Sequence, residues 1–166
     1  MEGNRILLLD MNHQCYAYIW RKIILSGYTI EYVDSVTEFF EKIKDNIYLL
    51  YIFDIVALPG NDRKWMEFDL KKRVGNWQDG PFLGLELLRS LFDPENASVY
   101  VESTTGRIFS GNALIFTAVD SKDDEIRTIL DSDIQIIKKP YRESDIFEKC
   151  CDQIVTFIKD KLDPEK

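Results

Sequence analysis

Residues 49–54, LLYIFD, form a short, unbroken apolar run that ends in a carboxylate, Asp54. Three other runs share this length and character, at residues 6–9, 113–116 and 134–137, and residues 28–33 supply a fifth. Short, unalternating runs are typical of strands that helices cover on both faces. The sequence therefore predicts a five-stranded parallel sheet whose third strand ends at Asp54.

Helical patterns lie between and after these runs. Apolar residues recur at helical spacing within residues 16–24, 36–43, 85–91, 126–130 and 147–158. The second pattern begins with a capping box, Ser35-Val36-Thr37-Glu38. Alternating strands and helices joined by right-handed crossovers give a doubly wound (βα)5 sheet of the flavodoxin-like α/β class. We expect residues 1–166 to form a single domain.

Two segments do not fit this alternation and are interpreted as insertions. Residues 60–82 are long for a loop after a strand, and they contain Trp65, Phe68 and Trp77 among many basic residues. We expect them to form an ordered lid or docking surface beside Asp54. Residues 97–111 have the pattern of a small hairpin before the fourth strand.

The composition limits the classes of partner. A formal net charge of −8 and an isoelectric point near 4.7 argue against a nucleic-acid partner, because phosphate contacts require a basic surface. The apolar run at residues 6–9 is too short for a signal peptide or a membrane span. We therefore expect a cytoplasmic protein that does not contact membranes.

Polar side chains end the predicted strands. Asp10 ends the first, Asp54 the third and Thr117 the fourth, while Lys138 and Lys139 end the fifth. In an open parallel sheet these ends share one edge, where ligands bind. Two carboxylates can hold a divalent cation, and an ammonium and a hydroxyl can bind oxygens of a phosphoryl group placed on an aspartate.

These strand ends are similar to the four signatures of the receiver domain of two-component response regulators. The matching stretches are Leu7-Leu8-Leu9-Asp10, Tyr51-Ile52-Phe53-Asp54, Ile115-Phe116-Thr117-Ala118 and Ile137-Lys138-Lys139-Pro140-Tyr141, with Gly84-Leu85-Glu86-Leu87-Leu88 at a helix start. The resemblance covers the chain apart from the two insertions.

The resemblance implies a set of site roles. Asp54 would accept the phosphoryl group, Thr117 and Lys139 would contact it, and Mg²⁺ would be held by Asp10, Asp54 and the backbone carbonyl of Val56. The resemblance also implies a sensor histidine kinase or phosphotransfer protein as donor, a downstream protein target and pairing with a second copy of the chain. Such a domain catalyses only its own phosphoryl transfer and dephosphorylation.

Three positions depart from the receiver pattern. Met11 replaces the second acid of the first strand, and a thioether is a poor ligand for Mg²⁺, so we expect weakened metal binding. Pro59 follows Asp54 one position late, which predicts a rebuilt loop. Ile136 replaces an aromatic switch residue. The Lys139–Pro140 bond is expected to be cis, as in the family.

Two other interpretations stay open at the level of sequence. A pseudo-receiver, which binds proteins without being phosphorylated, would account for Met11 and the altered loop. A phosphatase similar to the haloacid dehalogenases would need a second Asp two residues after Asp10, where the chain has Asn12.

Overall fold

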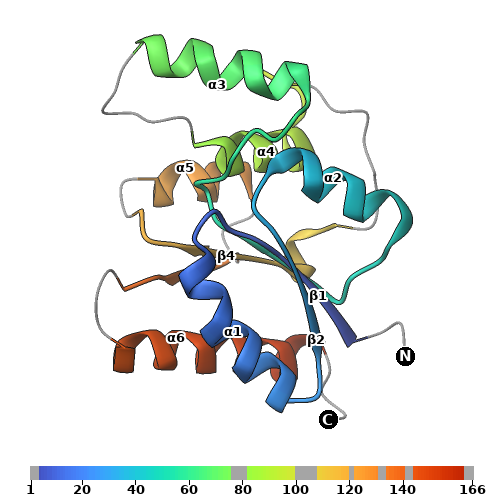
Figure 1. Cartoon of the computed structure of the whole chain (residues 1–166), viewed down its shortest axis with the longest axis vertical. Helices are drawn as coiled ribbons and strands as arrows, with labels where there is room; N and C mark the ends of the chain where they lie inside the picture. The colour runs from blue at the N-terminus through green and yellow to red at the C-terminus, as the bar shows by residue number, and fades with distance from the viewer. Residues whose placement is uncertain are drawn as a thin grey trace.

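The computed structural model describes residues 4–75, 82–99, 108–119, 122–130, 134–140 and 144–162, with the backbone alone at residues 13–15, 74–75, 110 and 144–147. The fold is a three-layer α/β sandwich with a central sheet and helices on both faces (Figure 1). The predicted α/β class is confirmed.

The sheet has five parallel strands in the order β2-β1-β3-β4-β5. Their bounds are β1 Arg5–Leu9, β2 Thr29–Val33, β3 Leu50–Phe53, β4 Ala113–Thr117 and β5 Gln135–Lys138. Every residue of β3 and β4 is buried, because helices cover both faces of these central strands. Each predicted strand is present within a residue or two of its expected bounds.

Helices cover the two faces unequally. The helices on one face are α1 His13–Leu25 and α6 Ser144–Phe157, which continues as a π-helical turn, Ile158–Leu162. The helices on the other face are α2 Val36–Asp45, α4 Leu83–Phe92 and α5 Asp123–Ile129. The predicted cap is present, since Ser35 Oγ accepts a hydrogen bond from the Glu38 amide. Each face of the sheet has its own apolar core.

The helix α1 buries a narrower stripe than its spacing predicts. Ile19 and Ile23 are buried against the sheet, but Trp20 is 45% exposed and Ile24 38% exposed. Lys22 pairs with Asp152 and Glu148, which joins α1 to α6 at the surface. β2 is an edge of the sheet that the described residues form, so that sheet does not extend past it toward Trp20 and Ile24.

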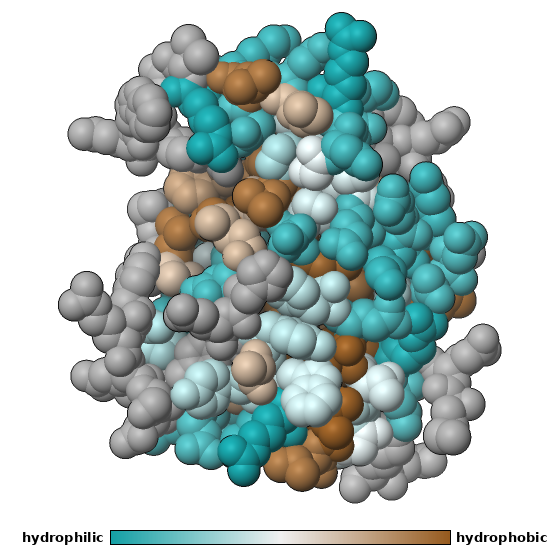
Figure 2. Space-filling view, viewed as in Figure 1, coloured by the Kyte–Doolittle hydropathy of each residue, from teal (hydrophilic) through white to brown (hydrophobic). Residues whose placement is uncertain are grey.

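The first insertion forms a helix of its own, α3 Arg63–Gly75, which lies outside the layer of α2 and α4 (Figure 1). Trp65 anchors it, with 2% of its surface exposed and its ring centroid 6.2 Å from that of Phe40 on α2. The surface at this end of the molecule mixes hydrophilic and apolar side chains (Figure 2), and Met66 and Leu70 of α3 are exposed. The sequence predicts that this insertion is structured, and α3 confirms this for residues 63–75. Trp77 lies outside the described residues.

Two smaller predictions have different outcomes. The hairpin expected at residues 97–111 lies mostly outside the described residues, and its described C-terminal part is a 3₁₀ turn, Ser110–Asn112. The predicted cis bond is wrong, because the Lys139–Pro140 peptide is trans, the lower-energy isomer even before proline. Among the helices of the described ranges, none combines the length and apolar character that a membrane crossing requires.

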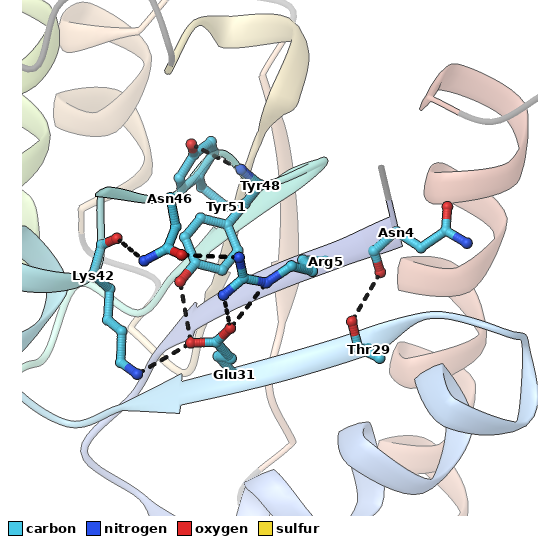
Figure 3. Close-up of polar contacts among 8 residues, drawn as sticks. All are labelled: Asn4, Arg5, Thr29, Glu31, Lys42, Asn46, Tyr48 and Tyr51. Atoms are coloured by element: carbon cyan, nitrogen blue, oxygen red, sulfur yellow. Dashed lines mark hydrogen bonds and ion pairs between the residues drawn. The ribbon is translucent and has the colours of Figure 1, made fainter. Parts of the chain in front are cut away.

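A polar network fastens α2 to the amino edge of the sheet (Figure 3). Its centre is Glu31 of β2, which accepts from Arg5 Nε at 3.0 Å and from the Tyr48 hydroxyl at 3.1 Å and pairs with Lys42 Nζ at 3.1 Å. Arg5 also donates to Asn46 Oδ1 at 2.9 Å and lies 4.9 Å from the Tyr48 ring centroid. Burial beside Glu31 raises the pKa of Tyr48 to about 12.

This network predicts an acid-sensitive contribution to stability. Burial alone would raise the pKa of Glu31, but hydrogen bonds from Arg5 and Lys42 outweigh burial and hold it below its ordinary value. The contribution is therefore complete above the unfolded pKa and is lost as pH falls through the lower folded pKa. Glu31→Gln should lower the free energy of unfolding at pH 7 by about 1 to 2 kcal/mol.

Urea unfolding between pH 3 and pH 7 checks this prediction. The difference between wild type and Glu31→Gln should shrink as the pH falls, while Glu41→Gln, an exposed position on α2, should track wild type throughout. A difference that stays constant with pH would assign the effect of the substitution to packing rather than to charge.

Candidate functional site

The carboxyl ends of β1, β3 and β5 bring three of the predicted residues into contact. Lys139 Nζ lies 2.5 Å from Asp10 Oδ2 and 2.6 Å from Asp54 Oδ2. All three residues are at least nine-tenths buried, with exposures of 0% for Asp10, 6% for Asp54 and 7% for Lys139. One ammonium thus bridges two carboxylates that lie 44 positions apart in the sequence.

Backbone groups hold the other carboxylate oxygens. Asp10 Oδ1 accepts from the Asn12 amide at 2.8 Å, and Asp54 Oδ1 accepts from the Val56 amide at 3.3 Å. The Tyr32 hydroxyl donates to the Asp10 backbone carbonyl. Because each carboxylate has donors on both oxygens, the two side chains are fixed in orientation.

The electrostatics favour a charged lysine. Burial works to lower the pKa of Lys139, but the charges of Asp54 and Asp10 outweigh it and raise the pKa. The Lys139 ammonium also lies 5.1 Å from the Phe116 ring centroid. Burial raises the pKa of Asp10 despite the opposing charge of Lys139. The side chains of Asp10, Asp54 and Lys139 thus place one ammonium group between two carboxyl groups.

Thr117 lies on the same edge but is held differently. Its side chain is fully buried at the end of β4, and its hydroxyl accepts from the Val119 amide at 3.3 Å. The Lys139 amide donates to the Thr117 carbonyl at 2.9 Å, which joins β4 to the residue that follows β5. Thr117 is therefore beside the bridge, although no hydrogen bond in the described part of the chain joins its hydroxyl to Asp54.

The two consecutive lysines have separate partners. Lys138 pairs with Asp123 at the start of α5 and donates to the Val119 carbonyl at 2.8 Å. Lys138 therefore contacts the loop between β4 and α5, whereas Lys139 contacts Asp10 and Asp54. The strand pattern explains this division, because successive side chains point to opposite sides of a strand.

The loop after Asp54, for which the late Pro59 predicts an altered course, is attached to the segment that opens α2. Leu58 pairs with Ser35 in an isolated parallel bridge, with the Val36 amide 2.9 Å from the Leu58 carbonyl. The Thr37 hydroxyl donates to the Pro59 carbonyl at 2.7 Å and accepts from the Asp62 amide at 3.1 Å. The loop is thereby attached to the start of α2.

Gly84 is a site residue whose role the sequence pattern does not reveal. Its amide donates to the Ile55 carbonyl at 3.0 Å. A Cβ atom on Gly84 would lie 2.0 Å from the Asp54 carbonyl oxygen and 2.8 Å from Ile55 Cα. Only glycine allows α4 to begin this close to the backbone of Asp54.

Asp10 and Asp54 are candidate oxygen ligands for a magnesium ion. Within the described ranges, no group of three or more His, Cys, Asp or Glu side chains is arranged to hold a metal. Asp10 and Asp54 do converge, and Mg²⁺ commonly binds through one or two carboxylates while keeping several waters. Met11 is 44% exposed at this edge and supplies no oxygen. A cation would have to share both carboxylates with Lys139.

Comparison with known proteins identifies the fold. No family model matches the sequence, and no curated protein matches it. Among solved structures, the signal receiver domain of a response regulator from Bermanella marisrubri superposes with a TM-score of 0.56 at 15% identity, covering 94% of this chain and 98% of that one. The response regulator DrrB of Thermotoga maritima gives 0.57 at 12% identity, and this chain spans only 54% of its length.

A third structure, the response regulator TrrA of Thermotoga maritima in complex with Mg²⁺-BeF, gives a TM-score of 0.50 at 17% identity over 92% of this chain and 98% of that one. At these identities the similarity establishes the fold. The chain therefore has the fold of response-regulator receiver domains, as its strand-end motifs predict.

Proposed function

We propose that this chain is a receiver domain that accepts a phosphoryl group on Asp54 and signals through protein contacts. The observation that supports the proposal most strongly is the bridge from Lys139 to Asp10 and Asp54, at the edge where Thr117 also lies. The four chemical groups that the resemblance requires thus lie at one end of the sheet of a receiver fold.

The residues of the chain would divide the chemistry among them. The Asp54 carboxylate would attack the phosphorus of a phosphodonor, forming an acyl phosphate as the donor's leaving group departs. Lys139 would move from the Asp54 oxygen to a phosphoryl oxygen, and the Thr117 hydroxyl would turn from the Val119 amide to another. Phosphorylation adds about −1.5 to −2 charges, which Lys139 is placed to pair with.

Magnesium would support this reaction. We propose Asp10, Asp54 and the Val56 carbonyl as its ligands, and bound Mg²⁺ would neutralise charge on the phosphoryl oxygens. The proposed donors are a sensor histidine kinase, a phosphotransfer protein or a small phosphodonor, and a downstream protein would read the modified surface. We propose no enzymatic activity on other substrates.

Intact mass spectrometry after treatment with acetyl phosphate and Mg²⁺ tests the proposal. Wild type should gain about 80 Da, one phosphoryl group, and Asp54→Asn should gain nothing. Asp62→Asn is a matched control on the same loop, where an exposed side chain caps α3 by accepting from the Lys64 and Trp65 amides. An adduct that persists in Asp54→Asn would contradict the assignment, and no adduct on wild type would favour a pseudo-receiver.

A substitution at Met11 should strengthen metal binding. Met11→Asp adds a carboxylate beside Asp10 and should raise the affinity for Mg²⁺ about tenfold, measured by calorimetric titration. Met66→Asp is the matched control, because Met66 on α3 is also 44% exposed. An equal gain in both variants would show that added negative charge, rather than a completed site, attracts the cation.

A further inference from the structure

A pocket separate from the phosphorylation site lies between α3 and the segment that follows α4. It has a volume of about 540 Å³ and is lined by Lys64, Glu67, Phe68, Lys71, Lys72, Ser98 and Val99. We call it the α3 lysine pocket. Three of its side chains are cationic in a protein whose formal net charge is −8.

The acids of α3 form their ion pairs with its arginines, although the charge of Lys71 also helps to lower the pKa of Glu67, after the hydrogen bond and charge of Arg63. The helix has two acids, and each pairs with an arginine of the same helix. Glu67 Oε1 lies 2.7 Å from Arg63 Nε, and Asp69 Oδ2 lies 2.8 Å from Arg73 Nε. Across the described residues, no carboxylate oxygen lies within 4.0 Å of the ammonium groups of the three pocket lysines, Lys64, Lys71 and Lys72.

Both walls of the pocket are anchored by buried groups. On one side, Trp65 fixes α3 to α2. On the other, the buried carboxylate of Glu86 accepts from the amides of Ser98 and Val99, and Ser90 Oγ donates to the Val99 carbonyl at 2.6 Å. Glu86 is itself held by Arg89 at 3.1 Å. These contacts hold the two walls of the pocket in place.

The pocket combines its charge with an apolar surface. Phe68 is half-buried within it, and Lys72 Nζ lies 5.5 Å from the Phe68 ring centroid. Val99 contributes a buried aliphatic side chain to the opposite wall. A ligand that fits this lining carries several negative charges and at least one apolar group.

We propose that the α3 lysine pocket binds a short acidic segment of a partner protein, with an apolar side chain of that segment against Phe68 and Val99. Lysine ammonium groups are point charges that pair readily with carboxylates. A long nucleic acid would extend beyond the pocket over a protein whose formal net charge is −8, and this excess negative charge would repel its phosphates. A short acidic segment confines its charge to the region of the three lysines.

Fluorescence anisotropy with a labelled eight-residue peptide of glutamates around one phenylalanine tests this proposal. Wild type should bind it at least about tenfold more tightly than the same peptide with glutamines in place of glutamates, and the binding should weaken with added salt. The variant Lys64→Gln/Lys71→Gln/Lys72→Gln should lose at least about tenfold in affinity.

A matched variant separates the pocket from general electrostatics. Lys149→Gln/Lys159→Gln/Lys161→Gln removes the same formal charge from exposed positions on α6 and on the turn that follows it, and should change affinity less than about twofold. Circular dichroism should show unchanged melting for both triple variants. Equal losses in the two variants, absence of peptide binding, or tighter binding of duplex DNA through the pocket lysines would each overturn the proposal.

Discussion

Replacing Lys139 with leucine should lower the free energy of unfolding at pH 7 by about 3 to 5 kcal/mol. The substitution removes the one ammonium that contacts both Asp10 and Asp54, and the two carboxylates remain buried side by side. An uncompensated buried charge is among the most costly defects in a protein interior. Urea unfolding at pH 7, followed by tryptophan fluorescence and circular dichroism, measures the loss.

Two further variants make this prediction specific. Lys138→Leu removes the neighbouring lysine, which pairs with Asp123 at a partly exposed position, and should cost no more than about 1 kcal/mol. The variant Asp10→Asn/Asp54→Asn/Lys139→Leu removes all three charges and should recover part of the stability lost in Lys139→Leu. Equal costs for the two single lysine variants would show that the buried bridge contributes no more than a surface pair.

Substituting alanine for Gly84 should disrupt the proposed phosphorylation site without altering any polar group in it. The new methyl group would meet the Asp54 carbonyl oxygen at 2.0 Å, so either α4 or the Asp54 backbone must move. Overpacking of this kind costs about 1 to 3 kcal/mol, and displacement of a reacting group by about 1 Å can slow chemistry up to a hundredfold. We therefore expect Gly84→Ala to take up the phosphoryl group from acetyl phosphate at least about tenfold more slowly.

Gly111→Ala is the matched control for this prediction. A Cβ atom there would meet only the ring of Phe109, at 2.8 Å, and that side chain is 56% exposed and free to rotate away. Its phosphorylation rate and stability should remain close to wild type. A Gly84→Ala variant that is destabilised yet phosphorylated at the wild-type rate would contradict the prediction. It would show that α4 can repack without displacing Asp54.

The strands and the convergence of the charged residues could be predicted from sequence because both follow from local patterns. Continuous apolar runs identify buried parallel strands, and the topology of such a sheet places their carboxyl ends together. Asp10, Asp54 and Lys139 therefore meet as predicted. The apolar pattern alone does not divide the roles of Lys138 and Lys139, because the side of the strand on which each lies depends on the register of β5. The resemblance to receiver domains selected Lys139, and Lys139 is the lysine that contacts Asp10 and Asp54.

The features that the sequence did not predict depend on contacts between distant segments. The helix α3 has no clear apolar stripe, because an acid, Asp69, is buried on the same side as Trp65. The role of Gly84 depends on how closely α4 approaches Asp54, which no local pattern records. Trp20 and Ile24 match helical spacing but lie beside an edge strand, so the pattern overstated their burial.

The attachment of the loop after Asp54 to the start of α2 affects the entropy of partner binding. Restricting one residue to a single backbone conformation costs about 1 to 2 kcal/mol at 25 °C. Leu58, Pro59 and Asp62 are already held by Ser35, Val36 and Thr37, so this cost is met when the chain folds. A protein that docks over this loop would encounter a preorganised surface, and its affinity would not be reduced by the ordering of a flexible segment.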